Sequence, residues 1–249
     1  MKSKAFWQFR AAAGKEKAGE LLLYGPISST TWWGDEVTPK QFAEDLAKLG
    51  DIDTLTVYMN SEGGDIFAAQ AIYSQLKRHR ATVTVYIDGL AASAASVVAM
   101  AGDTVVMPTN AMMMVHNPWT IALGNATEFR KLADDLDTIR ESMIAAYTEK
   151  TALGRDEIIA LLDAETWLTA EDAVEKGFAD EVAAEKKVAA SLRDGKYVVN
   201  GREVDITAFK RFPADKIPST VLEPDEGAKA KAAQERRIAR LRRMADTFV

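Results

Sequence analysis

The residues of this chain whose types and spacing suit nucleophilic chemistry are a serine, a histidine and two neighbouring carboxylates: Ser93, His116, Asp163 and Glu165. A serine attacks a carbonyl carbon when an imidazole accepts its proton and a carboxylate orients that imidazole. The chain contains two histidines and no cysteine, which excludes thiol chemistry. His79 stands among basic residues at the end of a predicted helix and is expected to be solvated. If Ser93 has an imidazole base, that base is therefore His116.

Ser93 lies in a run of small residues after Gly89, at the predicted start of a helix. Exposed backbone N–H groups and the helix dipole favour developing negative charge at such a position. The alternative is a serine that caps an alanine-rich helix. Ser96, one turn further on, is expected to face the interior.

The pair Gly63-Gly64 follows a predicted strand, where a turn without side chains lets the backbone approach a ligand closely. One N–H of this turn and the N–H of Ala94 would together form an oxyanion hole. The alternative is an ordinary turn. His116 closes an apolar strand and could equally be a core residue, and the two carboxylates could cap helices.

Composition describes one soluble globular domain with an appendage. The chain has 249 residues, of which 47% are hydrophobic and 27% charged, and a net charge of −6. These values exclude a disordered polyelectrolyte and a disulfide-stapled miniature. The acidity argues against nucleic-acid binding, and no apolar run suits a signal peptide or a membrane span. We expect a cytoplasmic protein, with no cofactor, metal or membrane partner.

Strand and helix patterns alternate along the chain, which is typical of an α/β fold. Up to Gly89, which is expected to end the third strand, the strands predicted are Glu20–Tyr24, Thr54–Met59 and Ala81–Ile87, and the helices are Thr38–Gly50 and Asp65–Arg78. After it we predict a helix from Leu90, strands over Thr104–Met107 and Ala111–His116, and helices over Thr127–Thr151, Arg155–Leu162 and Thr169–Gly177.

The character of the sequence changes beyond Val182. Residues 196–206 predict a hairpin with an Asn200-Gly201 turn, 213–227 a proline-rich connection, and 228–248 a basic helix. That helix is either a solvated tail or a docking element for an acidic partner. We therefore predict a domain over 1–185 and an extension over 186–249.

Several motifs together resemble one known family. They are Asn60-Ser61-Glu62-Gly63-Gly64, Ala71-Ile72-Tyr73, Gly89-Leu90-Ala91-Ala92-Ser93, Ala101-Gly102, Met114-Val115-His116-Asn117-Pro118 and residues 168–177. In order and spacing they resemble the proteolytic subunit of the Clp protease, over roughly residues 20 to 182.

The resemblance implies a ClpP/crotonase-like α/β fold with a long handle helix, and a serine endopeptidase. Ser93 would be its nucleophile and His116 its general base, with Gly64 and Ala94 as oxyanion donors. The acid falls on Glu165 in place of the usual aspartate, with Asp163 as the alternative. The segments after Gly64 and His116 would flank an extended peptide, and subunits would form heptamer-like rings that meet through the handle helix.

The chain differs from the usual Clp sequence at several positions, and these differences bear on which branch of the family it resembles. Glu62 replaces a usual proline and Ala95 a usual glycine, and the N-terminal segment does not match the axial loop, which leaves docking to an unfoldase ATPase open. The long extension is more like the ClpP-related head-maturation proteases of phages and prophages. We therefore favour processing of scaffold and capsid precursors, in the cytoplasm of a bacterium or a phage-infected host, over housekeeping ATP-dependent degradation. A crotonase-type acyl-CoA hydratase or isomerase, a Ser–Lys peptidase and a non-catalytic assembly subunit remain as alternatives.

Overall fold

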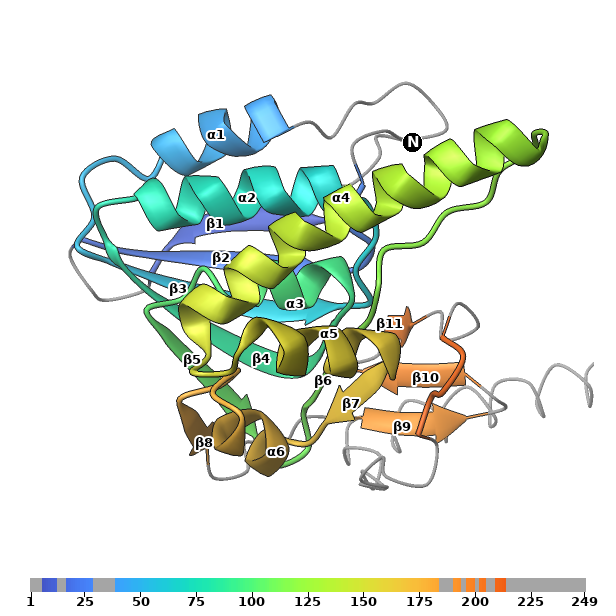
Figure 1. Ribbon diagram of the computed structural model, residues 1–249. Helices are drawn as coiled ribbons and strands as arrows, with labels where there is room; N and C mark the ends of the chain where they lie inside the picture. Colours follow the sequence, from blue (N-terminus) through green and yellow to red (C-terminus); the bar gives the residue numbers. More distant parts are fainter. Residues whose placement is uncertain are drawn as a thin grey trace, which may run out of the picture. The chain divides into compact units, whose positions relative to one another are not determined.

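The structure is a computed structural model, and it describes residues 6–12, 17–28, 39–183, 190–193, 196–199, 202–204 and 209–213 (Figure 1). For 190–193, 196–199 and 202–204 only the backbone is described. Contacts group residues 1–218 into one compact unit, to which every described residue belongs. The boundary near 185 stays a prediction. The Asn200-Gly201 turn, most of the proline-rich connection and the basic helix over 228–248 lie outside the described residues.

Strands and helices alternate through the described chain, as the sequence predicts. The strands are β1 (Trp7–Ala11), β2 (Ala18–Tyr24), β3 (Thr54–Ser61), β4 (Thr82–Ala92), β5 (Thr104–Pro108), β6 (Met112–Val115), β7 (Thr166–Leu168), β8 (Glu181–Ala183), β9 (Ala190–Arg193), β10 (Lys196–Val199) and β11 (Arg202–Val204). The helices are α1 (Pro39–Ala47), α2 (Ile66–Arg78), α3 (Ala94–Ala99), α4 (Ala126–Lys150), α5 (Arg155–Asp163) and α6 (Ala170–Glu175).

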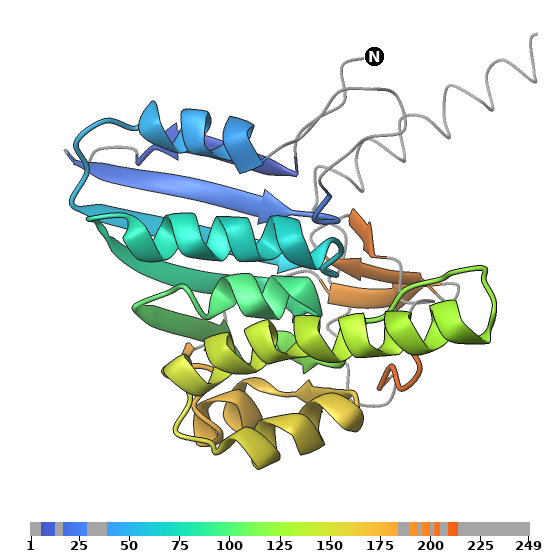
Figure 2. The ribbon, with the colours of Figure 1, turned by 45° about the horizontal axis from the view of Figure 1, so that its top comes forward.

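The first eight strands form one mixed sheet within the described residues. Its centre is parallel: β2 pairs with β3, β3 with β4, and β4 with both β5 and β6. Antiparallel strands β1 and β7 are added at its margins. Helices α1 to α4 lie over one face of this sheet (Figure 2), and β9 to β11 form a separate antiparallel sheet. The predicted α/β fold class is confirmed.

The sheet differs from the prediction at its first strand. Residues 7–11 form β1, which pairs antiparallel with β2 and which the sequence reading missed. Its Trp7 is buried, and the indole ring packs edge-on against Phe42 of α1. Aromatic contacts therefore stabilise β1 in the sheet, although the basic sequence at the start of the chain does not indicate a strand.

The second difference from the prediction concerns the strand that leads to Ser93. Gly89 does not end the strand: β4 continues to Ala92, and the helix predicted from Leu90 begins at Ala94. The extra residues pair with β6, Leu90 opposite Met112 and Ala92 opposite Met114. They are small or apolar and fully buried, so pairing with a second strand outweighs their helix propensity.

Helix caps and interior contacts follow the sequence more closely. The capping box of α6 is present, with Thr169 accepting from Asp172 and Asp172 accepting from Thr169. Ser96 is fully buried, as predicted, and its hydroxyl lies 2.8 Å from that of Tyr147 on α4. The N-terminal part of α4 extends beyond the sheet and is mostly exposed (Figure 1). None of the described helices has the length and apolar character that crossing a membrane requires.

Candidate active site

Ser93 stands on a sharp turn between β4 and α3. Its φ of 55° and ψ of −127° are rare for a residue with a side chain. Its N–H donates to the carbonyl of Met114 at 2.9 Å, which ties the turn to β6. The hydroxyl makes no capping hydrogen bond to α3. A capping role therefore does not explain this serine, and its Oγ is left for another partner.

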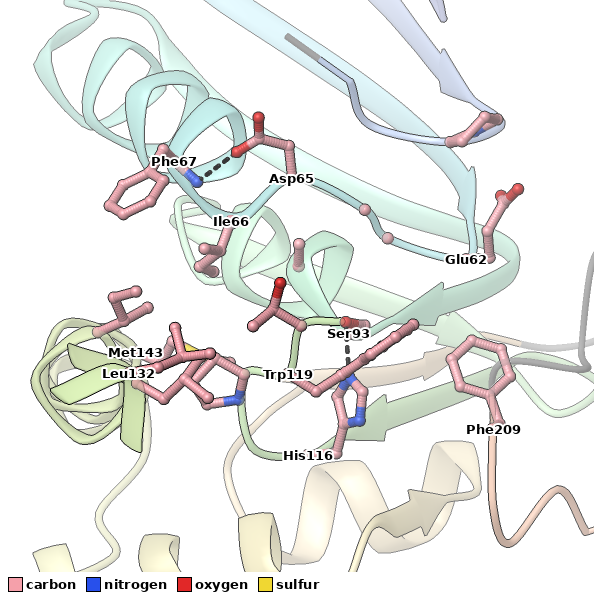
Figure 3. Close-up of a pocket in the computed structure, with 18 residues that line it drawn as sticks. Glu62, Asp65, Ile66, Phe67, Ser93, His116, Trp119, Leu132, Met143 and Phe209 are labelled. Atoms are coloured by element: carbon pink, nitrogen blue, oxygen red, sulfur yellow. Dashed lines mark hydrogen bonds between the residues drawn. The ribbon is translucent and has the colours of Figure 1, made fainter. Parts of the chain in front are cut away.

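That partner is His116, the residue after β6. Pairing of Ala92 with Met114 brings the ends of β4 and β6 together, and the His116 Nε2 lies 2.7 Å from the Ser93 Oγ (Figure 3). The imidazole is buried, with 7% of the residue exposed. His79 is half-buried at the end of α2, where its Nδ1 accepts from the N–H of Ala81. The expectation that His79 is solvated holds in part, since the ring is half-exposed and one of its nitrogens binds the backbone.

Burial sets the protonation of His116. Desolvation lowers the pKa of the imidazole below its usual value, because the charged form loses hydration. The negative charge of Glu165 opposes this shift, and the positive charge of Lys210 adds to it. The ring is therefore held neutral near pH 7, the form that accepts a proton.

The two glycines at the end of β3 allow a close approach to the Ser93 turn. A Cβ on Gly63 would lie 2.6 Å from the Ala92 carbonyl oxygen and 2.7 Å from the Ser93 Cβ. A Cβ on Gly64 would lie 2.0 Å from the carbonyl oxygen of Ile27. Both φ angles are positive, +94° and +139°. Only glycine fits at these two positions, which an ordinary turn would not require.

Some of the backbone N–H groups around Ser93 and the two glycines donate hydrogen bonds within the protein. Within the described chain, the N–H groups of Ile27, Gly63 and Asp65 donate to the Gly63 carbonyl, the Ser61 hydroxyl and the Ile27 carbonyl respectively. For the N–H groups of Gly64 and Ala94, no acceptor is found among the residues that the structure describes, and Ala94 directly follows Ser93. Such a pair can stabilise an oxyanion, at roughly 3 kcal/mol per donor.

The two candidate acids have different partners. The Asp163 carboxylate accepts from the Asn117 side chain at 2.7 Å and lies 3.5 Å from Arg140. The Glu165 carboxylate accepts from the backbone N–H groups of Lys210 and Arg211. Neither hydrogen-bonds to the His116 ring in the described part of the chain. Of the two, Glu165 acts on the pKa of that ring.

A cleft of about 670 Å³ opens over Ser93 and His116. Residues after Gly64 and after His116 line it, as the sequence predicts, including Ile66, Phe67, Pro118 and Trp119. Two groups of lining residues were missed: the α4 side chains Leu132, Leu136, Ile139 and Met143, and Phe209 from the extension. The apolar spacing of α4 predicts only a helix, which the resemblance assigns to contact between subunit rings. Phe209 falls in a polar stretch, and no sequence signal tied it to the site.

The arrangement can support acyl transfer. It offers a hydroxyl hydrogen-bonded to a neutral imidazole, with a pair of backbone donors beside it. The walls of the cleft are largely apolar, with Glu62 and Asp65 on one side (Figure 3).

Comparison with known proteins finds one family that matches the chain. Residues 34–186 match the family model described as Clp protease. The chain is 28% identical over 158 residues to an ATP-dependent Clp protease proteolytic subunit of Bacteroides fragilis, covering 61% of this chain and 76% of that protein. It is 30% identical over 167 residues to ATP-dependent Clp protease proteolytic subunit 1 of Chlamydia muridarum, covering 62% of this chain and 86% of that protein.

Proposed function

Because the chain belongs to the Clp protease family, we propose that it is a serine endopeptidase with Ser93 as nucleophile and His116 as general base. The observation that carries the proposal is the 2.7 Å contact between His116 Nε2 and Ser93 Oγ on a strained turn. The lowered pKa of His116 supports it, because a neutral imidazole is the form that accepts the proton.

In the proposed reaction, Ser93 Oγ attacks the scissile carbonyl carbon as its proton passes to His116 Nε2. The N–H groups of Gly64 and Ala94 donate to the oxyanion that forms. The imidazolium then protonates the leaving amine, and the C–N bond breaks to give an acyl-enzyme. Water, deprotonated by the same imidazole, hydrolyses the ester and restores Ser93.

We propose that Glu165, rather than Asp163, is the acid of the Ser-His-acid triad. Its charge is close enough to act on the His116 pKa, whereas Asp163 is engaged by Asn117 and Arg140. A carboxylate beside the ring would stabilise the imidazolium and hold its orientation.

Labelling with a fluorophosphonate tests this function. The probe phosphonylates an activated serine with loss of fluoride, so we expect one adduct per chain, mapped by mass spectrometry to Ser93. Ser93→Ala and His116→Ala should abolish labelling, and Ser96→Ala should retain it. Absence of labelling at neutral pH in the assembled protein would reject the peptidase mechanism.

We propose that the protein assembles from copies of itself into rings. The exposed apolar side chains at and before α4, which include Ile121, Leu123 and Phe129, support a subunit contact there. Native mass spectrometry should give a ring of subunits, and a monomer at micromolar concentration would contradict the assembly.

For the biological substrate, we propose scaffold and capsid precursors processed during phage head maturation. The support is the chain beyond residue 186, which lies outside the family match. The alternative is degradation with an ATPase partner, which the names of the bacterial relatives favour for those proteins. Limited cleavage of precursors without ATP would support maturation. Processive degradation that needs ATP and a Clp ATPase would support the alternative.

A further inference from the structure

A short piece of the extension, residues 209–213, lies against the proposed active site; we call it the Phe209 segment. The Phe209 ring meets the His116 imidazole edge-on, with ring centroids 6.3 Å apart, and meets the Trp167 ring at 5.3 Å. Phe209 lines the same cleft as Ser93. Figure 3 shows it on the side of His116 away from α4.

The backbone of this segment is anchored on Glu165. The Lys210 N–H donates to one carboxylate oxygen at 3.1 Å, and the Arg211 N–H donates to the other at 2.6 Å. The Arg211 guanidinium also donates to the Ala164 carbonyl at 2.8 Å. Each oxygen of the carboxylate is therefore fixed in direction by a separate donor.

A carboxylate held in this way can still serve the imidazole. It offers about four lone-pair sites, of which two amide donors occupy two. Glu165 itself has a φ of +48°, a conformation in which side-chain-bearing residues are uncommon. The backbone of Glu165 is held by its own N–H, which donates to the Leu162 carbonyl at 3.2 Å, and its carboxylate is held by the amides of the segment.

We propose that the Phe209 segment is a positioning element of the active site: Phe209 covers the His116 ring, and the amides of Lys210 and Arg211 direct the Glu165 carboxylate. The inference rests on the proposed function, because it assigns the segment a task in the same serine relay. It makes part of the extension a component of the peptidase site.

Loss of the Phe209 ring changes the environment of His116 in a stated direction. The charged groups that act on the imidazole are Glu165 and Lys210, while Asp163 is engaged by Asn117 and Arg140. Phe209→Ala leaves all of these charges in place and admits water to the ring. The pKa of His116 should then rise toward its usual value, because the charged form regains hydration.

The test compares Phe209→Ala, Phe209→Leu and Phe212→Ala in the full-length assembled protein. Phe212 is the matched control, because its ring contacts Trp167 from the same segment but does not line the cleft. The first readout is carbethoxylation of His116 by diethyl pyrocarbonate, mapped by mass spectrometry with His79 as internal reference. The second is the pH midpoint of fluorophosphonate labelling at Ser93.

We expect Phe209→Ala to raise the modification rate of His116 severalfold and to move the labelling midpoint upward by roughly half a pH unit. Phe209→Leu should restore most of both values, and Phe212→Ala should change them much less. Equal values in Phe209→Ala and wild type, or equal changes in Phe209→Ala and Phe212→Ala, would overturn the inference. Failure of the wild type to label would reject the proposed function, and the modification rate, which needs no turnover, would still decide the covering role of Phe209.

Discussion

The serine end and the acid end of the proposed relay are held in different ways. Ser93 is held by buried backbone. Its neighbours Ala92 and Ala94 are at most 2% exposed, and its N–H donates a hydrogen bond to β6. Glu165 lies in a half-exposed turn between α5 and β7, and its carboxylate is held by residues 45 and 46 positions further along the chain.

Because of this difference, contacts at one end of the site can be lost without unfolding the domain, whereas contacts at the other end cannot. Disturbing the serine turn disturbs buried backbone and therefore the stability of the fold. Contacts at an exposed turn open at little cost to the whole domain. We expect the acid end to be the place where activity can change without unfolding.

The largest effect tests the serine end for chemistry alone. Ser93→Ala keeps the backbone and removes the nucleophile, so kcat for a fluorogenic peptide should fall on the order of a millionfold. The melting temperature should stay near that of the wild type. Hydrolysis retained at the wild-type rate would show that another residue attacks the substrate.

The next prediction concerns the acid end. Glu165→Ala should lower kcat by roughly 10⁴-fold, because the imidazolium formed in the reaction loses the negative charge that stabilises it. Asp163→Ala should have a much smaller effect, since it loses contacts to Asn117 and Arg140. Peptide hydrolysis measures both variants, and thermal melting should show little change. The reverse order of activities would assign the acid to Asp163.

The coupling of activity to stability at the serine end is tested by glycine replacement. Gly63→Ala places a Cβ against Ala92 and Ser93 at a positive φ, and should cost about 3 kcal/mol of unfolding free energy together with activity. Gly50→Ala is the control. The φ of Gly50 is also positive, +69°, but a Cβ added there would have nothing within 4 Å, so the substitution should cost only about 1 kcal/mol of unfolding free energy. Urea unfolding of the two variants checks the difference. Equal losses would show that the approach to Ser93 is not tight.

The two ends also share a pH dependence through His116. Burial lowers the pKa of this ring, so the neutral base persists below the usual value of 6.5. Labelling of Ser93 should therefore fall as pH drops, with a midpoint below 6.5. Glu165→Gln removes a charge that raises the pKa and should move the midpoint lower still. A midpoint above 6.5 in the wild type would contradict the burial argument.

The smallest effect lies beneath the serine turn. Tyr147→Phe removes the hydroxyl that meets Ser96, at a cost of about 1 kcal/mol. Activity should stay near that of the wild type, because Ser96 still donates to the Ser93 carbonyl at 2.6 Å. Urea unfolding with a peptide assay measures both. A large loss of activity would show that Tyr147 also fixes the turn.

Most of the fold follows from the sequence because its signals are local. Alternating β-branched runs and capped helices placed β3, α2, α4 and α6 within one to three residues of their bounds. The errors arise where distant partners decide. Strand β1 depends on β2 and on Phe42 for its burial, and the end of β4 depends on β6. Propensity within a window carries neither partner.

The residue types along the chain identify the groups that can do the chemistry: a serine among small residues, a histidine that closes an apolar strand, a glycine pair and no thiol. The contact between His116 and Ser93 depends on the fold, because pairing of β4 with β6 sets that 2.7 Å distance. The fold also joins Phe209 and the amides of Lys210 and Arg211 to the site. The physical reason is that residue type fixes reactivity, whereas distance and burial arise only when segments remote in sequence pack together.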